Sequence, residues 1–291
     1  METLTTSLVT GCSTGIGLAT AVELASRGHR VYASMRNEAS CGPLLAAAEE
    51  AQTEVRILGL DVDDLASIED GVERVLDNEG RLDVLVNNAG LGDLSSVEEA
   101  DPHLLLRMFR TNVFGPIALI RSVLPSMRSA GSGTIVNVSS VSARIVSAYS
   151  GPYAATKCAM EAITQALAIE GASHGIRAFA IEPGFVKTPM IGKALATLRD
   201  ASAPYKTVAG FIRDLYEDGL EGGEDPIKVA RVIGDAIDSA DATIQRPVGP
   251  SAEWVIKGRE STADEAWIDL WTSRTQAEFG ERFQELFGDP P

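Results

Sequence analysis

The sequence predicts an α/β fold in which helices cover both faces of one doubly wound parallel sheet. Two observations support this prediction. Short β-branched runs alternate with longer stretches of helical periodicity from residue 7 to about 190, and this alternation is typical of right-handed crossovers between parallel strands. The chain has 291 residues, 45% of them hydrophobic and 23% charged, so it can bury a sizeable core.

The expected elements follow one another in a regular order. Apolar runs predict the strands, and helical spacing of apolar residues predicts the helices between them. Strands and helices alternate at 8–10, 16–27, 31–33, 43–52, 55–58, 65–78, 84–86, 103–129, 135–138, 153–173 and 178–181. Proline and glycine then punctuate two short apolar helices over 190–225, and a helix at 226–239 and a strand at 243–248 resume the alternation.

We expect one domain over residues 1–291, with the irregular segment as an insertion over the site. Its parts are a cofactor-binding and catalytic core at 5–190, a substrate lid at 190–225, a last helix and strand at 226–250, and a helical C-terminal extension at 251–291. The extension carries 4 basic and 9 acidic residues, a charge of -5, which argues against a membrane-anchoring helix. Its apolar stripe predicts docking on the body or on a partner subunit near the lid, through Trp254, Trp267, Leu270, Trp271, Phe279, Phe283, Leu286 and Phe287.

The charge and the cysteines exclude several functional classes. With 25 basic and 41 acidic side chains the net charge is -16, so we expect neither nucleic acid nor a membrane as partner. The N-terminus has no signal-peptide pattern, and no segment approaches the roughly 18 apolar residues of a membrane span. The three cysteines form no CxxC pair and the three histidines lie far apart, which predicts a cytoplasmic protein without a metal site.

A glycine-rich turn, Thr10-Gly11-Cys12-Ser13-Thr14-Gly15-Ile16-Gly17, joins the first expected strand to the first helix. Glycines at such a turn let the main chain approach a pyrophosphate, and the helix N-terminus supplies N–H groups. The alternative is a turn that only closes the packing of strand and helix. The position of the turn favours dinucleotide binding, with contacts from Gly11, Ser13, Thr14, Gly15, Ile16 and Gly17.

The end of the second expected strand carries Arg36, where NAD-binding sites place an acidic residue. A guanidinium group suits the geometry of a 2′-phosphate, so NADP(H) is favoured over NAD(H). Two alternatives stay open: Arg36 is a solvated loop cation, or nearby Glu38 takes the role of the acid.

Tyr153 and Lys157 are four residues apart at the start of an expected helix, which places both side chains on one face. A free tyrosine has a pKa near 10, so proton transfer at neutral pH requires a stabilised phenolate. Lowering the pKa by about three would take roughly 4 kcal/mol, more than an exposed pair supplies, so a positively charged nicotinamide would have to help. The alternative is an ordinary amphipathic face, but the pair follows the strand that ends beside Ser140.

These motifs, with Asn87-Asn88-Ala89-Gly90 and Pro183-Gly184, occur in the order and spacing of the short-chain dehydrogenase/reductase superfamily. The chain resembles this superfamily over residues 5 to about 190, and its TGxxxGxG spacing resembles the oxidoreductase branch rather than the epimerases and dehydratases. Residues 9–36 are similar to the retinol and 17β-hydroxysteroid dehydrogenase-like group, which is largely NADP(H)-linked. The resemblance implies a Rossmann-type fold and a homodimer or homotetramer formed through the helices at 103–129 and 153–173.

The resemblance also implies the catalytic roles. Tyr153 would exchange the proton with the substrate oxygen, and Lys157 would bind the nicotinamide ribose and lower the Tyr153 pKa. Ser140, in preference to Ser139, would hydrogen-bond the carbonyl, and Asn112 would support a water-linked proton relay. The further implied cofactor contacts, besides Arg36, Tyr153 and Lys157, are Asp61, Val62, Asn88, Ala89, Gly90, Pro183, Gly184, Val186 and Thr188.

One departure from the family is visible beyond Ser140, where its common glycine is absent. Arg144 follows close by instead, and we expect it to reshape the mouth of the pocket.

Apolar residues around the expected site predict a bulky lipophilic alcohol or ketone as substrate. The expected substrate contacts are Ser140, Tyr149, Tyr153 and Met190. The alternative is that the surrounding apolar residues pack the lid on the body: Leu91, Val141, Ile145, Val146, Ile191, Leu195, Leu198, Tyr205, Phe211 and Leu215.

The sequence therefore predicts an NADP(H)-dependent short-chain alcohol dehydrogenase or carbonyl reductase. The alternative from another class is a non-catalytic NADP-binding sensor or scaffold with the same fold. An intact set of Asn112, Ser140, Tyr153 and Lys157 argues against that alternative, because a binding protein needs no general acid.

Overall fold

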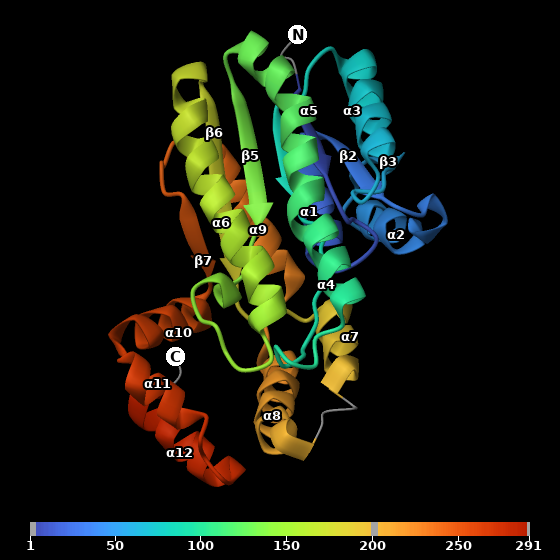
Figure 1. Cartoon of the computed structure of the whole chain (residues 1–291). Coiled ribbons are helices and arrows are strands. Elements are labelled where there is room, and N and C mark those ends of the chain that lie inside the picture. The colour runs from blue at the N-terminus through green and yellow to red at the C-terminus, as the bar shows by residue number, and fades with distance from the viewer. Residues whose placement is uncertain (1–3, 199–202, 290–291) are drawn as a thin grey trace.

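The computed structural model describes residues 4–198 and 203–289, so residues 199–202 of the expected lid and 290–291 of the extension lie outside the described residues. Its centre is a seven-stranded parallel sheet in the order β3-β2-β1-β4-β5-β6-β7 (Figure 1). The predicted fold class is confirmed. The strands are β1 (Thr6–Val9), β2 (Arg30–Met35), β3 (Val55–Gly59), β4 (Val84–Asn87), β5 (Gly133–Val138), β6 (Ile176–Pro183) and β7 (Gln245–Val248).

Helices cover both faces of the sheet. One face packs against α1 (Gly15–Ser26), α2 (Gly42–Glu50) and α9 (Pro226–Asp238). The other packs against α3 (Leu65–Glu79), α5 (Gly115–Ala130) and α6 (Gly151–Gly171). Among the described residues, no helix combines the length and the apolar character needed to cross a membrane.

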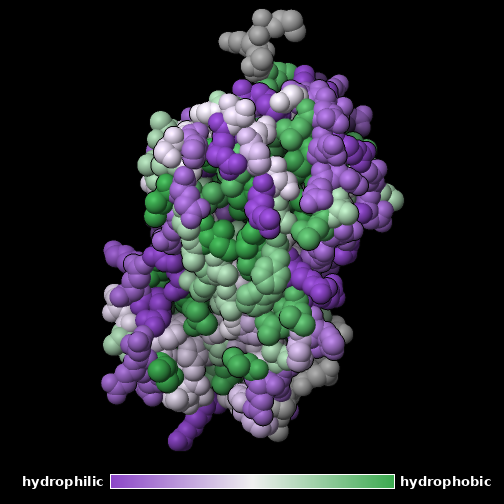
Figure 2. Space-filling model, turned by 45° about the horizontal axis from the view of Figure 1, so that its top comes forward, coloured by the Kyte–Doolittle hydropathy of each residue, from purple (hydrophilic) through white to green (hydrophobic). Residues whose placement is uncertain are grey.

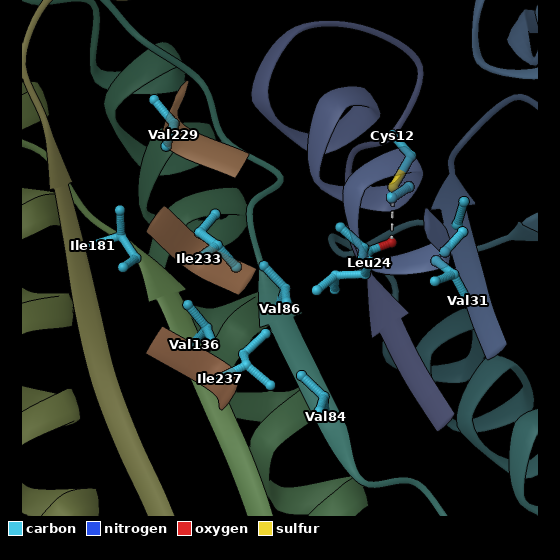
Figure 3. Packing of buried hydrophobic residues seen from close by; sticks show 14 of the residues in the cluster. Cys12, Leu24, Val31, Val84, Val86, Val136, Ile181, Val229, Ile233 and Ile237 are labelled. Atoms are coloured by element: carbon cyan, nitrogen blue, oxygen red, sulfur yellow. Dashed lines mark hydrogen bonds between the residues drawn. The ribbon is translucent and has the colours of Figure 1, made fainter. Parts of the chain in front are cut away.

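Alternating strand residues build the two halves of the core. Val84 and Val86 of β4 face α9, where they pack with Ile233 and Ile237 (Figure 3). Leu85, between them, belongs to the opposite cluster under α5. A strand buried on both faces is a continuous apolar run in the sequence. Such runs are the reason that the sequence predicts these strands.

The single helix expected at 103–129 is interrupted. It consists of α4 (Pro102–Phe109), a π-helical turn at Arg110–Phe114, and α5. A Cβ atom at Gly115 would overlap the carbonyl oxygen of Val62, so the chain lies close to the loop after β3 at this point. The wider turn holds Asn112 buried inside the protein.

The lid has two helices, α7 (Pro189–Thr197) and α8 (Lys206–Gly222), which lie at the carboxyl ends of the strands (Figure 1). At 17 residues α8 is not the short helix that was expected. The glycines within the helix do not break it, and the helix ends at Gly222. Gly219 serves packing, because a Cβ atom there would lie 2.5 Å from the ring of Phe185.

The C-terminal extension folds into α10 (Pro250–Ser261), α11 (Asp264–Leu270) and α12 (Gln276–Phe287). It docks on the lid of its own chain, where the rings of Phe211 in α8 and Phe279 in α12 stack with centroids 4.9 Å apart. Trp271 contacts both this aromatic cluster and the apolar cluster beneath the lid. The extension therefore supports the outer side of the lid helix.

Candidate active site

The glycine-rich turn lies tightly against the end of β4. Gly11 and Gly15 have φ values of +74° and +62°, which favour glycine. A Cβ atom at Gly11 would lie 2.8 Å from the Cα of Ala89, and one at Gly17 would overlap the carbonyl oxygen of Gly11. The turn can keep this shape only with glycine at these positions.

Thr10 and Asn88 lock the turn to the next strand end. The Thr10 hydroxyl accepts hydrogen bonds from the main-chain N–H groups of Asn88 (2.9 Å) and Ala89 (3.0 Å). The Asn88 amide donates to the Thr10 carbonyl at 2.7 Å. Thr10 was seen in the motif but was not predicted as a site residue, although it fixes the position of two that were.

A cavity of about 410 Å³ opens along this turn at the carboxyl ends of the strands. It lies where the strand order reverses, between the neighbouring strands β1 and β4, and open α/β sheets bind nucleotides at such a point. The predicted cofactor residues that line it are Gly11, Ser13, Thr14, Gly15, Ile16, Arg36, Asp61, Val62, Asn88, Ala89, Gly90 and Thr188. The sequence did not reveal Leu60, Arg107 or Lys193, which also line it.

Arg36 and Glu38 take different places. Arg36 is exposed and lines the cavity, and no described residue forms an ion pair with it. Glu38 does not line the cavity; its carboxylate lies against Gly59, where a Cβ atom would be 2.5 Å away. The cavity end near β2 therefore presents a cation and not the carboxylate of Glu38.

Lys157 is buried beside the tyrosine ring, with its Nζ 5.6 Å from the Tyr153 ring centroid. Its ammonium group donates to the carbonyl oxygen of Val138 at 2.9 Å. Burial lowers the Lys157 pKa to about 8, while the charge of Glu161 opposes this effect. Helix α6 thus places both side chains on one face, as their spacing predicted.

Tyr153 retains its proton at neutral pH in the protein alone. Burial raises its pKa to about 12, and a hydrogen bond with the Ser140 side chain opposes the rise. The lowered pKa expected from Lys157 is therefore not a property of the protein by itself. Ser140 is fixed just after β5, where its hydroxyl accepts from the Ser142 N–H at 3.1 Å, whereas Ser139 is more deeply buried.

Asn112 ties the loop after β4 to helix α6. Its amide accepts from the Leu91 N–H (2.8 Å) and donates to the Leu91 carbonyl (2.8 Å) and the Thr156 hydroxyl (3.0 Å). Both hydrogens of the amide and one acceptor site of its oxygen therefore serve to hold these two elements together.

A second cavity, of about 150 Å³, continues from the first, and Ile16, Asn88, Thr188 and Met190 line both. Ser140, Tyr153 and Lys157 lie on its wall, and most of the remaining wall is apolar. Pro183, Gly184 and Val186, which were predicted as cofactor contacts, line this second cavity, and the sequence missed Leu94, Phe185 and Tyr216. Within 4–198 and 203–289 no three His, Cys, Asp or Glu side chains are grouped to hold a metal ion.

Tyr149 does not line either cavity. It is buried in the apolar cluster under the lid with Leu94 and Leu198, and its hydroxyl donates to the Tyr205 carbonyl at 3.3 Å. Val141, Met190 and Ile191 do line the second cavity. For Ile145, Leu195, Leu198, Tyr205 and Phe211 the packing alternative holds, because they belong to the clusters between lid, body and extension.

Arg144 does not reshape the pocket mouth, since it lines neither cavity. Its guanidinium group instead pairs with Glu182 of β6 at 3.5 Å and with Glu260 of α10. The arginine therefore connects the segment after Ser140 to the C-terminal extension.

Two buried carboxyl groups lie behind the site. Gln245 donates to Glu161 at 3.0 Å and to Glu182 at 3.3 Å, and Glu182 is fully buried. Burial, and then the charge of Glu161, raise the Glu182 pKa to about 7, while Arg144 opposes the rise. Ionisation of Glu182 therefore destabilises the folded state.

We expect Glu182→Gln to stabilise the protein at alkaline pH. A carboxyl group whose pKa is raised by folding contributes fully to the free energy of unfolding below its ordinary pKa of 4.5. This contribution is lost as the pH rises through about 7. The loss is at most about 3 kcal/mol. Urea unfolding should show a higher midpoint for the variant at pH 8 and equal midpoints near pH 4.5. Exposed Glu265→Gln serves as the control, and an equal difference at both pH values would contradict the expectation.

We call the first cavity, which follows the glycine-rich turn, the cradle. Together with the second cavity it fits a dinucleotide with a substrate beside it. The turn supplies free main-chain N–H groups at the start of α1, where a pyrophosphate would lie. Thr188 lines both cavities, and Gly184 lines the second. This arrangement can bring a hydride donor next to the hydroxyl groups of Ser140 and Tyr153.

Comparison with known proteins agrees with this geometry. The sequence profile described as short chain dehydrogenase matches residues 5–199. Retinol dehydrogenase 8 of Bos taurus is 36% identical over 253 residues, which are 83% of this chain and 80% of the relative.

Solved structures extend the similarity to the whole fold. The crystal structure of a short-chain dehydrogenase from Streptomyces avermitilis has a TM-score of 0.79 at 31% identity and covers 98% of this chain and 99% of its own. A variant of actinorhodin polyketide ketoreductase with NADPH has a TM-score of 0.73 at 30% identity, covering 85% and 97%. A match of this length, over the residues that build the cradle and the tyrosine site, means that the chain belongs to the short-chain dehydrogenase family, an oxidoreductase family that binds NAD(P).

Proposed function

We propose that the protein is an NADP(H)-dependent oxidoreductase that interconverts a lipophilic alcohol and its ketone or aldehyde, with Tyr153 as general acid and base. The observation that carries this proposal is the place of Tyr153, hydrogen-bonded to Ser140 and beside Lys157, in an apolar cavity that continues from the dinucleotide cradle. A binding protein would have no use for this set of groups.

The chain's own residues account for the proton in the reducing direction. When bound, the reduced nicotinamide supplies the hydride for the carbonyl carbon. Ser140 donates a hydrogen bond to the carbonyl oxygen, and Tyr153 transfers its proton to that oxygen as the hydride arrives. Lys157, protonated at neutral pH, stabilises the phenolate that remains. In the oxidising direction the same groups act in reverse.

The apolar walls support the lipophilic substrate class. Around the reacting oxygen they consist of Leu94, Val138, Val141, Phe185, Val186, Met190, Ile191 and Ala194. Such a lining contributes binding energy by removing apolar surface from water. A small sugar or carboxylate would leave most of these walls without a partner.

Arg36 supports the preference for NADP(H). We expect Arg36→Ser to raise the KM for NADPH by about tenfold or more, because a hydrogen bond to a charged group is worth about 1.5–3 kcal/mol. The KM for NADH should change less than twofold. Steady-state kinetics with both cofactors checks this, with exposed Arg128→Ser at the far end of α5 as the control. Equal changes for NADPH and NADH would count against a 2′-phosphate contact.

We also propose that the protein forms a homodimer or homotetramer through α5 and α6. Figure 2 shows a broad apolar area on the face that these helices present. Phe114, in the turn before α5, is 57% exposed, and Ile169 of α6 is 76% exposed. Light scattering should give at least twice the chain mass of 30.8 kDa, and Ile169→Asp should lower it. A monomeric wild-type protein would contradict this proposal.

The cytoplasmic location stays a proposal that rests on the cysteines. Cys12, Cys41 and Cys158 are free thiols, respectively buried, half-buried and exposed. Unpaired thiols are usual in a reducing compartment. Fractionation of the source cells tests the location directly.

A further inference from the structure

Tyr216 of the lid helix α8 lines the cavity that also contains Tyr153 and Ser140. It enters from the lid, and the other two lie on the body of the protein. Its place in the site could not be predicted from the sequence, because it lies 63 positions after Tyr153 in a segment whose apolar pattern is irregular. It adds a polar hydroxyl group to a lid wall that is otherwise apolar.

The position of the Tyr216 ring is well fixed. The ring packs edge-on against Phe185, with centroids 5.0 Å apart and planes at 83°. Phe185 itself lies against α8 at Gly219, one helical turn beyond Tyr216. The main chain of Phe185 accepts from the Glu224 N–H at 2.8 Å just after the end of α8. These contacts hold the ring at the cavity wall, so its hydroxyl has a defined place.

The Tyr216 hydroxyl differs from those of the other four tyrosines. Tyr32 donates to Glu79, Tyr149 to the Tyr205 carbonyl, Tyr205 to Glu98, and Tyr153 is paired with Ser140. In the described part of the chain, no residue forms a hydrogen bond with the Tyr216 hydroxyl. Because Tyr216 lines the cavity, its hydroxyl is available to donate a hydrogen bond to a ligand oxygen.

The charge state of the Tyr216 hydroxyl suits a hydrogen-bond donor. Burial raises the Tyr216 pKa above its ordinary value, and the nearby Tyr153 raises it further. The hydroxyl therefore keeps its proton at neutral pH. Tyr153 and Tyr216 line the same cavity of about 150 Å³, so one small molecule can contact both.

We propose that Tyr216 hydrogen-bonds a second oxygen of the substrate, next to the reacting carbonyl, so that the protein prefers ketones that carry a neighbouring hydroxyl or carbonyl group on an apolar skeleton. This inference rests on the proposed function and defines its substrate class more narrowly. Tyr153 and Ser140 take the reacting oxygen and Tyr216 takes the second one. The substrate is then held at two points. This determines which face of its carbonyl group is turned toward the hydride donor.

The test compares α-hydroxyacetophenone with acetophenone as substrates, using NADPH and the full chain. For Tyr216→Phe we expect kcat/KM to fall about tenfold with the hydroxyketone and less than twofold with acetophenone. Comparing each variant with wild type on the same ketone cancels the difference in intrinsic reactivity. Tyr32→Phe removes a hydroxyl that is bonded to Glu79 away from the cavity, and both rates should stay within twofold.

Two results would overturn the inference: an equal loss with both ketones, which would make Tyr216 a packing residue, or no loss with either. If wild-type protein reduces neither ketone, the proposed function fails separately. Calorimetry on the protein saturated with NADP⁺ then decides the inference. A preference for α-hydroxyacetophenone that is lost in Tyr216→Phe supports it, and equal affinity of wild type for both ketones overturns it.

Discussion

Replacing Tyr153 by phenylalanine is expected to lower turnover by a factor on the order of a hundred or more, the usual contribution of a positioned general acid. The ring stays in place, because only the hydroxyl is removed and Lys157 keeps its bond to the Val138 carbonyl. Cofactor affinity should therefore change little. Stopped-flow or steady-state turnover, together with a fluorescence titration of NADPH, measures the two effects separately.

Two outcomes would contradict this role for Tyr153. Unchanged turnover in Tyr153→Phe would exclude it as the proton donor. A parallel loss of NADPH binding would mean that the hydroxyl holds the cofactor site together instead. Tyr32→Phe is again the matched control, since its hydroxyl donates to Glu79 at the end of α3 and Tyr32 lines neither cavity.

The second large effect is expected from Gly17→Ala. The new methyl group would overlap the Gly11 carbonyl oxygen and the Asn88 side-chain nitrogen, and neither atom can move without opening the cradle. Overpacking of this kind costs roughly 1–3 kcal/mol of stability. NADPH affinity should fall on the order of a hundredfold, about 2.7 kcal/mol. Calorimetric titration and thermal unfolding measure both quantities.

Gly280→Ala provides the control for this substitution. Gly280 lies in α12 with open space around its Cβ direction. Alanine in an exposed helix is favoured by about 0.5–1 kcal/mol over glycine, so Tm should rise slightly and NADPH affinity should not change. Normal NADPH affinity in Gly17→Ala would show that the turn tolerates a side chain and that the cradle is not built as described.

The central strands of the sheet were predictable because they are buried on both faces. Runs such as Val84–Asn87 have no polar alternation to confuse the pattern, and each is followed by a helix with clear spacing. The π turn at Arg110–Phe114 left no trace in the sequence, because the apolar spacing continues through it almost unchanged. The length of α8 was underestimated since Gly219 resembles a break although it serves packing against Phe185.

The candidate site was predictable where its residues lie next to strand ends. The turn at 11–17, Asn88 to Gly90, and Ser140 with Tyr153 and Lys157 all occur at fixed positions relative to a strand. Tyr216 could not be found in this way, because only the docking of the lid decides which side of α8 faces the cavity. Glu182 was missed for a related reason: a glutamate at a strand end suggests solvent, and only the structure reveals its burial.

The most direct test of the proposed function is the oxidation of NADPH, and separately of NADH, followed by absorbance with apolar aromatic and steroidal ketones and with small polar carbonyl compounds. We expect turnover with NADPH and a bulky apolar ketone, slower turnover with NADH, and none above background in Tyr153→Phe. Tight NADPH binding without turnover in either direction across all these compounds would contradict the proposal and would favour a protein that senses NADP(H) without catalysis.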